Sequence, residues 1–225
     1  MYRFLPLLTL LVVWPTGNAA PELVVVGAFS RGDLSDWEPK KLRGVTDYRL
    51  VAIDDRIALK AISEGSASGL LKRIPVDLTR TPILAWSWRV DTIFPGTNER
   101  NRAGDDYPAR LYVIASGGHF FRRTRAINYV WSSGQPASSA WPNPYTATVI
   151  MVAVQSGSES LGEWVAQKRD VRSDFRRYFG QDITAIDGVA IMTDTDNTSG
   201  HAVAYYGDIY FEPAAPSESS REGLH

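Results

Sequence analysis

Residues 83–90, ILAWSWRV, decide the fold class. Apolar side chains alternate with small or polar ones along this stretch, and successive side chains of a β-strand point to opposite faces of a sheet. One face would carry Leu84, Trp86, Trp88 and Val90, and the other would carry Ser87 and Arg89. The alternation therefore predicts a strand that buries its tryptophans in a core and turns Arg89 outward.

The rest of the chain repeats this signal in short runs that Gly, Pro, Ser or Asn separate, as strands do. The runs cover residues 22–29, 48–54, 56–62, 107–115, 125–131, 147–155, 163–171, 186–194 and 202–211. One helix is expected over residues 171–179, where Asp170 can cap the first turn and Gly180 can end the last. About ten strands and one short helix predict an all-β, two-sheet antiparallel sandwich of the jelly-roll type, with a closed barrel as the alternative.

The composition excludes several classes of protein. A net charge of −1 leaves no basic excess to neutralise phosphates, so we expect no nucleic-acid partner. The 225 residues include no cysteine, which excludes disulfides, thiolate zinc sites and cysteine nucleophiles. Seven Trp and ten Tyr combine flat apolar faces with polar groups, which suits sugar-binding surfaces and large sandwich cores alike.

The two ends of the chain predict export and a tail. Arg3 precedes an apolar run over residues 4–14, and small residues follow Pro15. This order predicts a signal peptide over residues 1–19; an uncleaved membrane anchor is the alternative, but the run is short for a bilayer. We expect a single domain over residues 20–213 and a disordered tail over 214–225. The mature protein would be periplasmic or secreted, without a transmembrane span.

Alternation also places polar side chains on the outward faces of three expected strands. Arg110 alternates with apolar neighbours as Arg89 does, and Tyr206 and Asp208 share one face of their strand. If these strands belong to one sheet, the four side chains line one groove, since a concave sheet of a jelly roll can hold a ligand. The grouping fails if the structure places them on separate sheets.

The segment AGDDYPAR, residues 103–110, carries adjacent carboxylates, Asp105 and Asp106, followed by Arg110. Such a group can bind sugar hydroxyls, hold a cation or act as acid and base. The alternative is ordinary turn chemistry, in which the aspartates accept backbone N–H groups and form an ion pair with the arginine.

The segment TDTDN, residues 193–197, resembles the start of a calcium loop, in which Asp and Asn supply oxygen ligands. Asp194, Asp196 and Asn197 are therefore candidate metal ligands, and calcium is the candidate cofactor. The pattern has neither the central Gly nor the closing Glu of an EF-hand, so that site is rejected. An Asx-type turn between two strands explains the same residues and is favoured.

A long polar segment over residues 128–146 contains several aromatic side chains and three prolines. Loops of this length are functional or disordered, and the aromatics favour function. Tyr129, Trp131 and Trp141 are therefore candidate ligand-binding residues. The alternative is that both tryptophans pack down onto the end of the sandwich.

Hydrolase and nucleotide-binding signatures are absent from the sequence. It has three histidines, at positions 119, 201 and 225, and no G-x-S-x-G elbow, so a serine hydrolase is not supported. It also has no P-loop and no dinucleotide fingerprint.

Strings such as WSWRV, AGDDYPARLYV, WPNPYTA, VAIMTDTDNT and YYGDIYF resemble the bacterial domain-of-unknown-function family 3047, DUF3047, over nearly the whole mature chain. The resemblance implies an exported protein with no established activity. The segment FSRGDLSDWE, residues 29–38, also resembles the opening of galactose-binding and carbohydrate-binding jelly-roll modules. That second likeness concerns the fold, and fold does not determine function.

Three functions remain open. The first is a glycan-binding protein whose partner is a poly- or oligosaccharide, bound by aromatic stacking and by bidentate hydrogen bonds. The second is a carbohydrate-active enzyme, a glycoside hydrolase or polysaccharide lyase, that uses the Asp, Arg and Tyr cluster. The third is an assembly factor that binds another protein. The first is favoured.

Overall fold

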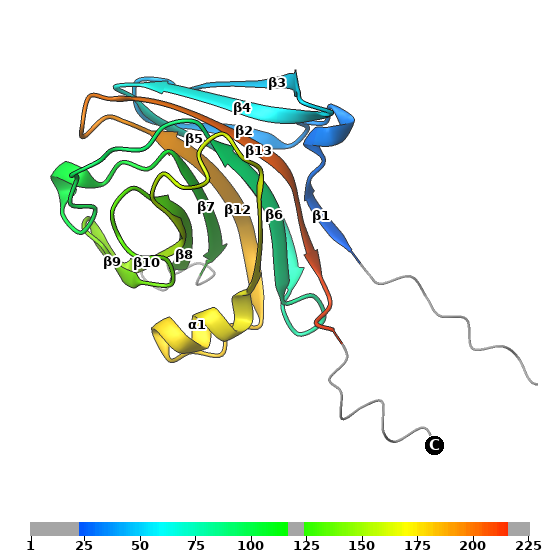
Figure 1. Cartoon of the computed structure of the whole chain (residues 1–225). Helices are drawn as coiled ribbons and strands as arrows, with labels where there is room; N and C mark the ends of the chain where they lie inside the picture. Colours follow the sequence, from blue (N-terminus) through cyan, green and yellow to red (C-terminus); the bar gives the residue numbers. More distant parts are fainter. Residues whose placement is uncertain (1–22, 117–123, 216–225) are drawn as a thin grey trace, which may run out of the picture.

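The computed structural model describes residues 23–116 and 124–215. Within them, two β-sheets pack face to face (Figure 1). The first, six-stranded sheet contains β1 (Val24–Gly27), β3 (Asp47–Ile53), β4 (Arg56–Glu64), β6 (Ile83–Val90), β11 (Val165–Asp170) and β13 (His201–Glu212). Its order is β11-β6-β13-β4-β3, and β1 also pairs with β13.

The second, seven-stranded sheet curls away from the first at the β8, β10 and β9 end (Figure 1). Its order is β2-β5-β12-β7-β8-β10-β9. The strands are β2 (Trp37–Arg43), β5 (Ala67–Asp77), β7 (Ala109–Ala115), β8 (Arg125–Ser132), β9 (Ala140–Asn143), β10 (Thr146–Ser156) and β12 (Ala185–Asp194). The predicted two-sheet jelly-roll sandwich is confirmed, and the alternative of a closed barrel is wrong.

One strand pair departs from the expected antiparallel pattern. β10 runs parallel to β8, from Val149 opposite Ala126 to Ser156 opposite Ser132. Parallel neighbours need a crossover connection. Here the chain leaves β8, forms β9 on the far side, and turns back into β10. Within the segment over residues 128–146, where a long loop was expected, residues 128–132, 140–143 and 146 are therefore strand.

The core lies between the inner faces of the two sheets. Trp88 contacts Trp131 across the sheets at a ring-centroid distance of 6.2 Å, and Trp86 contacts Tyr129 at 5.5 Å. The alternation predicted for residues 83–90 is confirmed, since the apolar set is buried while Ser87 and Arg89 are partly exposed. Burial of these large aromatic surfaces is a main contribution to the stability of a sandwich without disulfides.

The predicted helix is confirmed as α1 (Val171–Phe179). The Asp170 side chain accepts the Ser173 N–H at 2.9 Å, and Gly180 ends the helix in a left-handed conformation. The Phe175 side chain is fully buried against the core. Two short 3₁₀ helices lie in connecting loops. The first, η1 (Phe29–Arg31), lies between β1 and β2, and the second, η2 (Arg102–Gly104), lies between β6 and β7.

The predictions for the two ends of the chain fall largely outside the described residues. The predicted signal peptide over residues 1–19 lies outside the described residues, as do residues 216–225 of the predicted tail. Within the described ranges, no helix is both long and apolar enough to cross a bilayer.

Candidate functional site

A cavity of about 460 Å³ opens on the face of the seven-stranded sheet that points away from the core. It lies across the strands, from Leu42 and Arg43 of β2 to Thr146 of β10. Between them, Arg110, Tyr112, Met192 and Asp194 come from β7 and β12. We call this cavity the groove.

Arg110 forms the base of the groove and is only 3% exposed. Its Nε donates to Asp194 Oδ1 at 2.6 Å, and its Nη2 donates to the Asp105 carbonyl at 2.7 Å and contacts Asp194 Oδ2. Its Nη1 donates to the Tyr112 hydroxyl at 3.2 Å and lies 3.7 Å from Asp105 Oδ2. Burial acts to lower the pKa of Arg110, but the surrounding oxygens raise it above its usual value.

Asp105 is the second buried charge at this base. Burial raises the pKa of Asp105, while the positive charge of Arg110 opposes the shift. The Asn143 Nδ2 approaches both Asp105 carboxylate oxygens, at 3.4 and 3.5 Å. The AGDDYPAR segment therefore forms the ion pair that turn chemistry predicted, but it does so in the interior of a cavity.

Asp106 organises the turn that follows β12. Its Oδ1 accepts the backbone N–H and the side-chain Nδ2 of Asn197, both at 3.1 Å, and its Oδ2 accepts the Thr198 N–H at 2.6 Å. The Asx-type interpretation of residues 193–200 is thus supported, because a carboxylate from another loop satisfies the backbone of the turn.

Carboxylate oxygens of Asp106, Asp194 and Asp196 lie within 4.8 Å of one another, which is the arrangement a divalent cation would need. Both Asp194 oxygens already face Arg110, and both Asp106 oxygens accept N–H groups. Asn197 turns its Nδ2 toward this cluster. The cluster that contains the predicted ligands is therefore occupied by donors of the protein itself.

Aromatic and apolar side chains form the open part of the groove. Tyr145 is 53% exposed, and its hydroxyl donates to Asn197 Oδ1 at 3.0 Å. Leu42, 75% exposed, forms part of the same lining with Met192 and Tyr112. This surface offers flat apolar contacts to a ligand in a site that is open to solvent.

Two charged groups lie at the solvent side of the groove. Arg43 is exposed, and its Nη1 donates to the Asp196 carbonyl at 3.3 Å. The Asp196 side chain is partly exposed in the lining. The sequence analysis missed Leu42 and Arg43 as site residues, because β2 and the turn after β9 belong to opposite edges of the sheet and line one cavity only in the folded chain. Tyr145 belongs to the aromatic segment that was expected to face a ligand, and it does line the groove.

Glu99, which does not line the groove, is a further residue that the sequence analysis missed. Its buried carboxylate accepts the Ser133 N–H at 2.6 Å and the Ser132 hydroxyl, and burial raises its pKa. Its carbonyl accepts the Tyr107 hydroxyl and the Trp141 Nε1–H, both at 3.2 Å. Glu99 thereby fastens the loop between β6 and β7, which carries Asp105, to the end of β8.

The three aromatics predicted for a ligand-facing loop are buried, which corrects that expectation. Tyr129 and Trp131 lie on β8 with no exposed surface, and they point into the core. Trp141 is 3% exposed beneath the loop that Glu99 fastens. The alternative, in which the tryptophans pack onto the sandwich, is confirmed.

The expected grouping of Arg89, Arg110, Tyr206 and Asp208 in one groove is wrong. Arg110 belongs to the seven-stranded sheet and the other three to the six-stranded sheet. A bulge in β13 between Tyr206 and Ile209 shifts the alternation, because Tyr206 pairs with Trp88 and the next paired residue is Ile209. Tyr206 therefore points into the core.

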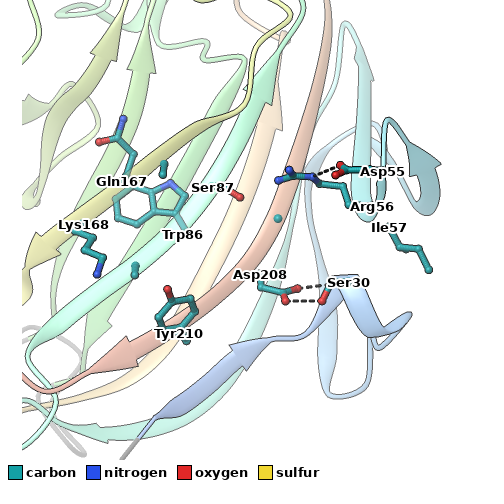
Figure 2. A pocket seen from close by; sticks show the side chains of 13 residues that line it. Ser30, Asp55, Arg56, Ile57, Trp86, Ser87, Gln167, Lys168, Asp208 and Tyr210 are labelled. Carbon is teal, nitrogen blue, oxygen red and sulfur yellow. Dashed lines mark hydrogen bonds and ion pairs between the residues drawn. The ribbon is translucent and has the colours of Figure 1, made fainter. Parts of the chain in front are cut away.

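Asp208 lies in a different hollow, of about 400 Å³, on the outer face of the six-stranded sheet (Figure 2). Its two carboxylate oxygens accept the Ser30 N–H at 2.8 Å and the Ser30 hydroxyl at 2.5 Å. Arg89 lies on the same outer face and pairs with Asp91 and Asp54. Asp208 thus anchors η1 to β13. Arg89 links the turn between β3 and β4, through Asp54, to Asp91 at the end of β6.

A family model described as "Protein of unknown function (DUF3047)" matches residues 35–210. No curated protein matches the chain. Among solved structures, the chain is similar to the family 11 carbohydrate-binding module of the cellulosomal cellulase Lic26A-Cel5E of Clostridium thermocellum, at 10% identity and a TM-score of 0.48, covering 89% of this chain and 99% of that one.

Two further solved structures resemble the chain. The CBM22-1 xylan-binding domain of Paenibacillus barcinonensis Xyn10C is 10% identical with a TM-score of 0.40, covering 89% of this chain and 100% of that one. An exo-β-agarase is 9% identical with a TM-score of 0.44, covering 87% of this chain and 26% of that one. These likenesses concern the arrangement of strands alone.

Proposed function

The chain belongs to the DUF3047 family, and from that premise we propose that it is an exported glycan-binding protein whose poly- or oligosaccharide ligand lies in the groove. The single observation that supports the proposal is the juxtaposition in that cavity of open aromatic and apolar surface with two charged hydrogen-bonding groups. Export rests on the predicted signal peptide over residues 1–19.

The chemistry of the lining suits a sugar ring. A pyranose presents a C–H face that packs on aromatic and apolar side chains, which Tyr145, Tyr112 and Met192 supply. Its edges carry hydroxyls that accept from guanidinium groups and donate to carboxylates, which Arg43 and Asp196 supply. The volume of about 460 Å³ falls within the range of ligand sites, roughly 300–1,000 Å³.

The alternative of a glycosidase has less support. Glycoside hydrolysis generally needs two carboxylates that face the scissile bond. Of the three aspartates that line the groove, Asp105 and Asp194 pair with Arg110. Asp196 remains as the carboxylate that is free of an ion pair with that arginine. The groove is thus better suited to holding a glycan than to cleaving one.

The test is isothermal titration of the protein against soluble polysaccharides, with Tyr145→Ala as the groove variant. An aromatic stacking contact contributes about 0.5–1.5 kcal/mol in addition to the apolar area that it buries, so we expect affinity to fall by about two- to thirteenfold. Tyr210→Ala, on the opposite face, is the control and should bind as the unmodified protein does (Figure 2). Absence of binding to every polysaccharide, or sensitivity to Tyr210→Ala alone, would contradict the proposal.

A further inference from the structure

The groove contains a buried arginine whose donors are directed at groups of the protein itself. A guanidinium has five N–H donors. In Arg110 the Nε donor faces Asp194, the two Nη2 donors face Asp194 and the Asp105 carbonyl, and the two Nη1 donors face Tyr112 and Asp105. An arginine at the base of a sugar site is the usual partner of a ligand carboxylate or sulfate, but this one is 3% exposed and already paired with Asp105 and Asp194.

The total charge of the lining is unfavourable for an anion. The lining contains two arginines, Arg43 and Arg110, and three aspartates, Asp105, Asp194 and Asp196, so its formal charge is 2 − 3 = −1. Asp106 lies directly behind it, bonded to the Asn197 backbone.

Arg43, in β2, is the other cation of the lining. Unlike Arg110, it is exposed. There it bonds to the Asp196 carbonyl, beside a carboxylate of opposite charge. Arg102 packs over the Tyr145 ring and donates to the Pro144 carbonyl, and it is not part of the lining. An acidic group on a bound sugar would therefore lose hydration beside Asp196 without gaining a desolvated cation.

We propose that the groove selects uncharged glycans and discriminates against glycans with a carboxylate on the bound residue. This inference rests on the proposed function and narrows its ligand class. Asp196 is the residue that sets the selectivity, because its carboxylate is the one in the lining that Arg110 does not neutralise. Discrimination of this kind arises from repulsion of the wrong ligand as much as from contacts with the right one.

The test compares neutral and anionic polysaccharides on the same backbone by isothermal titration. The pairs are hydroxyethylcellulose with carboxymethylcellulose, methyl-esterified with de-esterified homogalacturonan, and arabinoxylan with glucuronoxylan. In each pair that binds, we expect the neutral member to bind about tenfold more tightly, and we expect about 0.5 M salt to reduce this ratio because it screens the repulsion.

Asp196→Asn should narrow the ratio by about threefold or more, because it removes the repelling charge and keeps the shape. Asp55→Asn makes the same charge change on the opposite face and should leave the ratio as it is (Figure 2). Equal or tighter binding of the anionic members would overturn the inference and leave glycan binding standing. Binding of none of the six polysaccharides would overturn glycan binding as well.

Discussion

Replacing Tyr206 by Phe should destabilise the protein, although the change removes a single oxygen atom. The Tyr206 hydroxyl donates to the Met192 carbonyl at 2.7 Å and lies 2.9 Å from Thr193 Oγ1. It also accepts the backbone N–H of Arg110 at 3.3 Å. It therefore links β13 of one sheet to β12 and β7 of the other, at a position with no solvent exposure. A buried N–H and carbonyl left without this partner cost about 1–3 kcal/mol.

The measurement is urea and thermal unfolding of the mature protein. For a domain of this size, 1 kcal/mol lowers the melting temperature by about 2–4 °C, so we expect a decrease of about 2–12 °C. Tyr205→Phe is the matched control. Its ring lies on the outer face between Lys60 and Arg89, and among the described residues its hydroxyl has no hydrogen bond. We expect that variant to stay within about 0.5 kcal/mol.

Equal stability of the two variants would show that the hydroxyl of Tyr206 does not join the sheets. A different outcome would also be informative. If Tyr206→Phe lost glycan binding at unchanged stability, the residue would act on the ligand, as its position in the sequence first predicted.

Three further changes test the base of the groove. Arg110→Met leaves two buried carboxylates unpaired and should reduce the free energy of unfolding by about 3–5 kcal/mol in urea denaturation. Gly104→Ala would place a methyl group against the Asn98 backbone and should lower the melting temperature, whereas Gly134→Ala, with its nearest atom at 3.7 Å, should not. Burial raises the pKa of Asp105 in the folded state, so its ionisation opposes folding above that pKa and this cost disappears as the pH falls. The melting temperature of the unmodified protein relative to Asp105→Asn should therefore rise between pH 7 and pH 4, and a constant difference would contradict this account.

The sequence was sufficient where a property depends on near neighbours. Alternation at residues 83–90 identified the buried tryptophans of β6, and Asp170 and Gly180 bounded α1 correctly. Adjacent aspartates at positions 105 and 106 pointed to an ion pair with Arg110. Each inference used spacing within one segment, where geometry follows from the period of the strand or helix.

Properties that depend on which strands are neighbours could not be predicted from the sequence. Alternation gave the wrong face for Tyr206, since a bulge inserts residues that do not pair, and no local signal announced it. Leu42 and Arg43 belong to one edge of the seven-stranded sheet and Tyr145 to the other, yet they line one cavity in the folded chain. The sheet assignment of Arg89 and Arg110 failed for the same reason, because equivalent patterns can belong to either layer.

The position of β9 at the edge of its sheet has a consequence for how a ligand enters. β9 pairs with β10 alone, and Pro142 lacks an amide hydrogen, so few backbone bonds hold the strand. Strands held in this way open locally at a small fraction of the free energy of global unfolding. Asn143 ends this strand and Tyr145 follows it, so local opening of the strand end would move one wall of the groove, while the buried Trp141 side chain keeps its bond to the Glu99 carbonyl. We therefore expect fast amide hydrogen exchange in β9, and slower exchange there once a polysaccharide is bound.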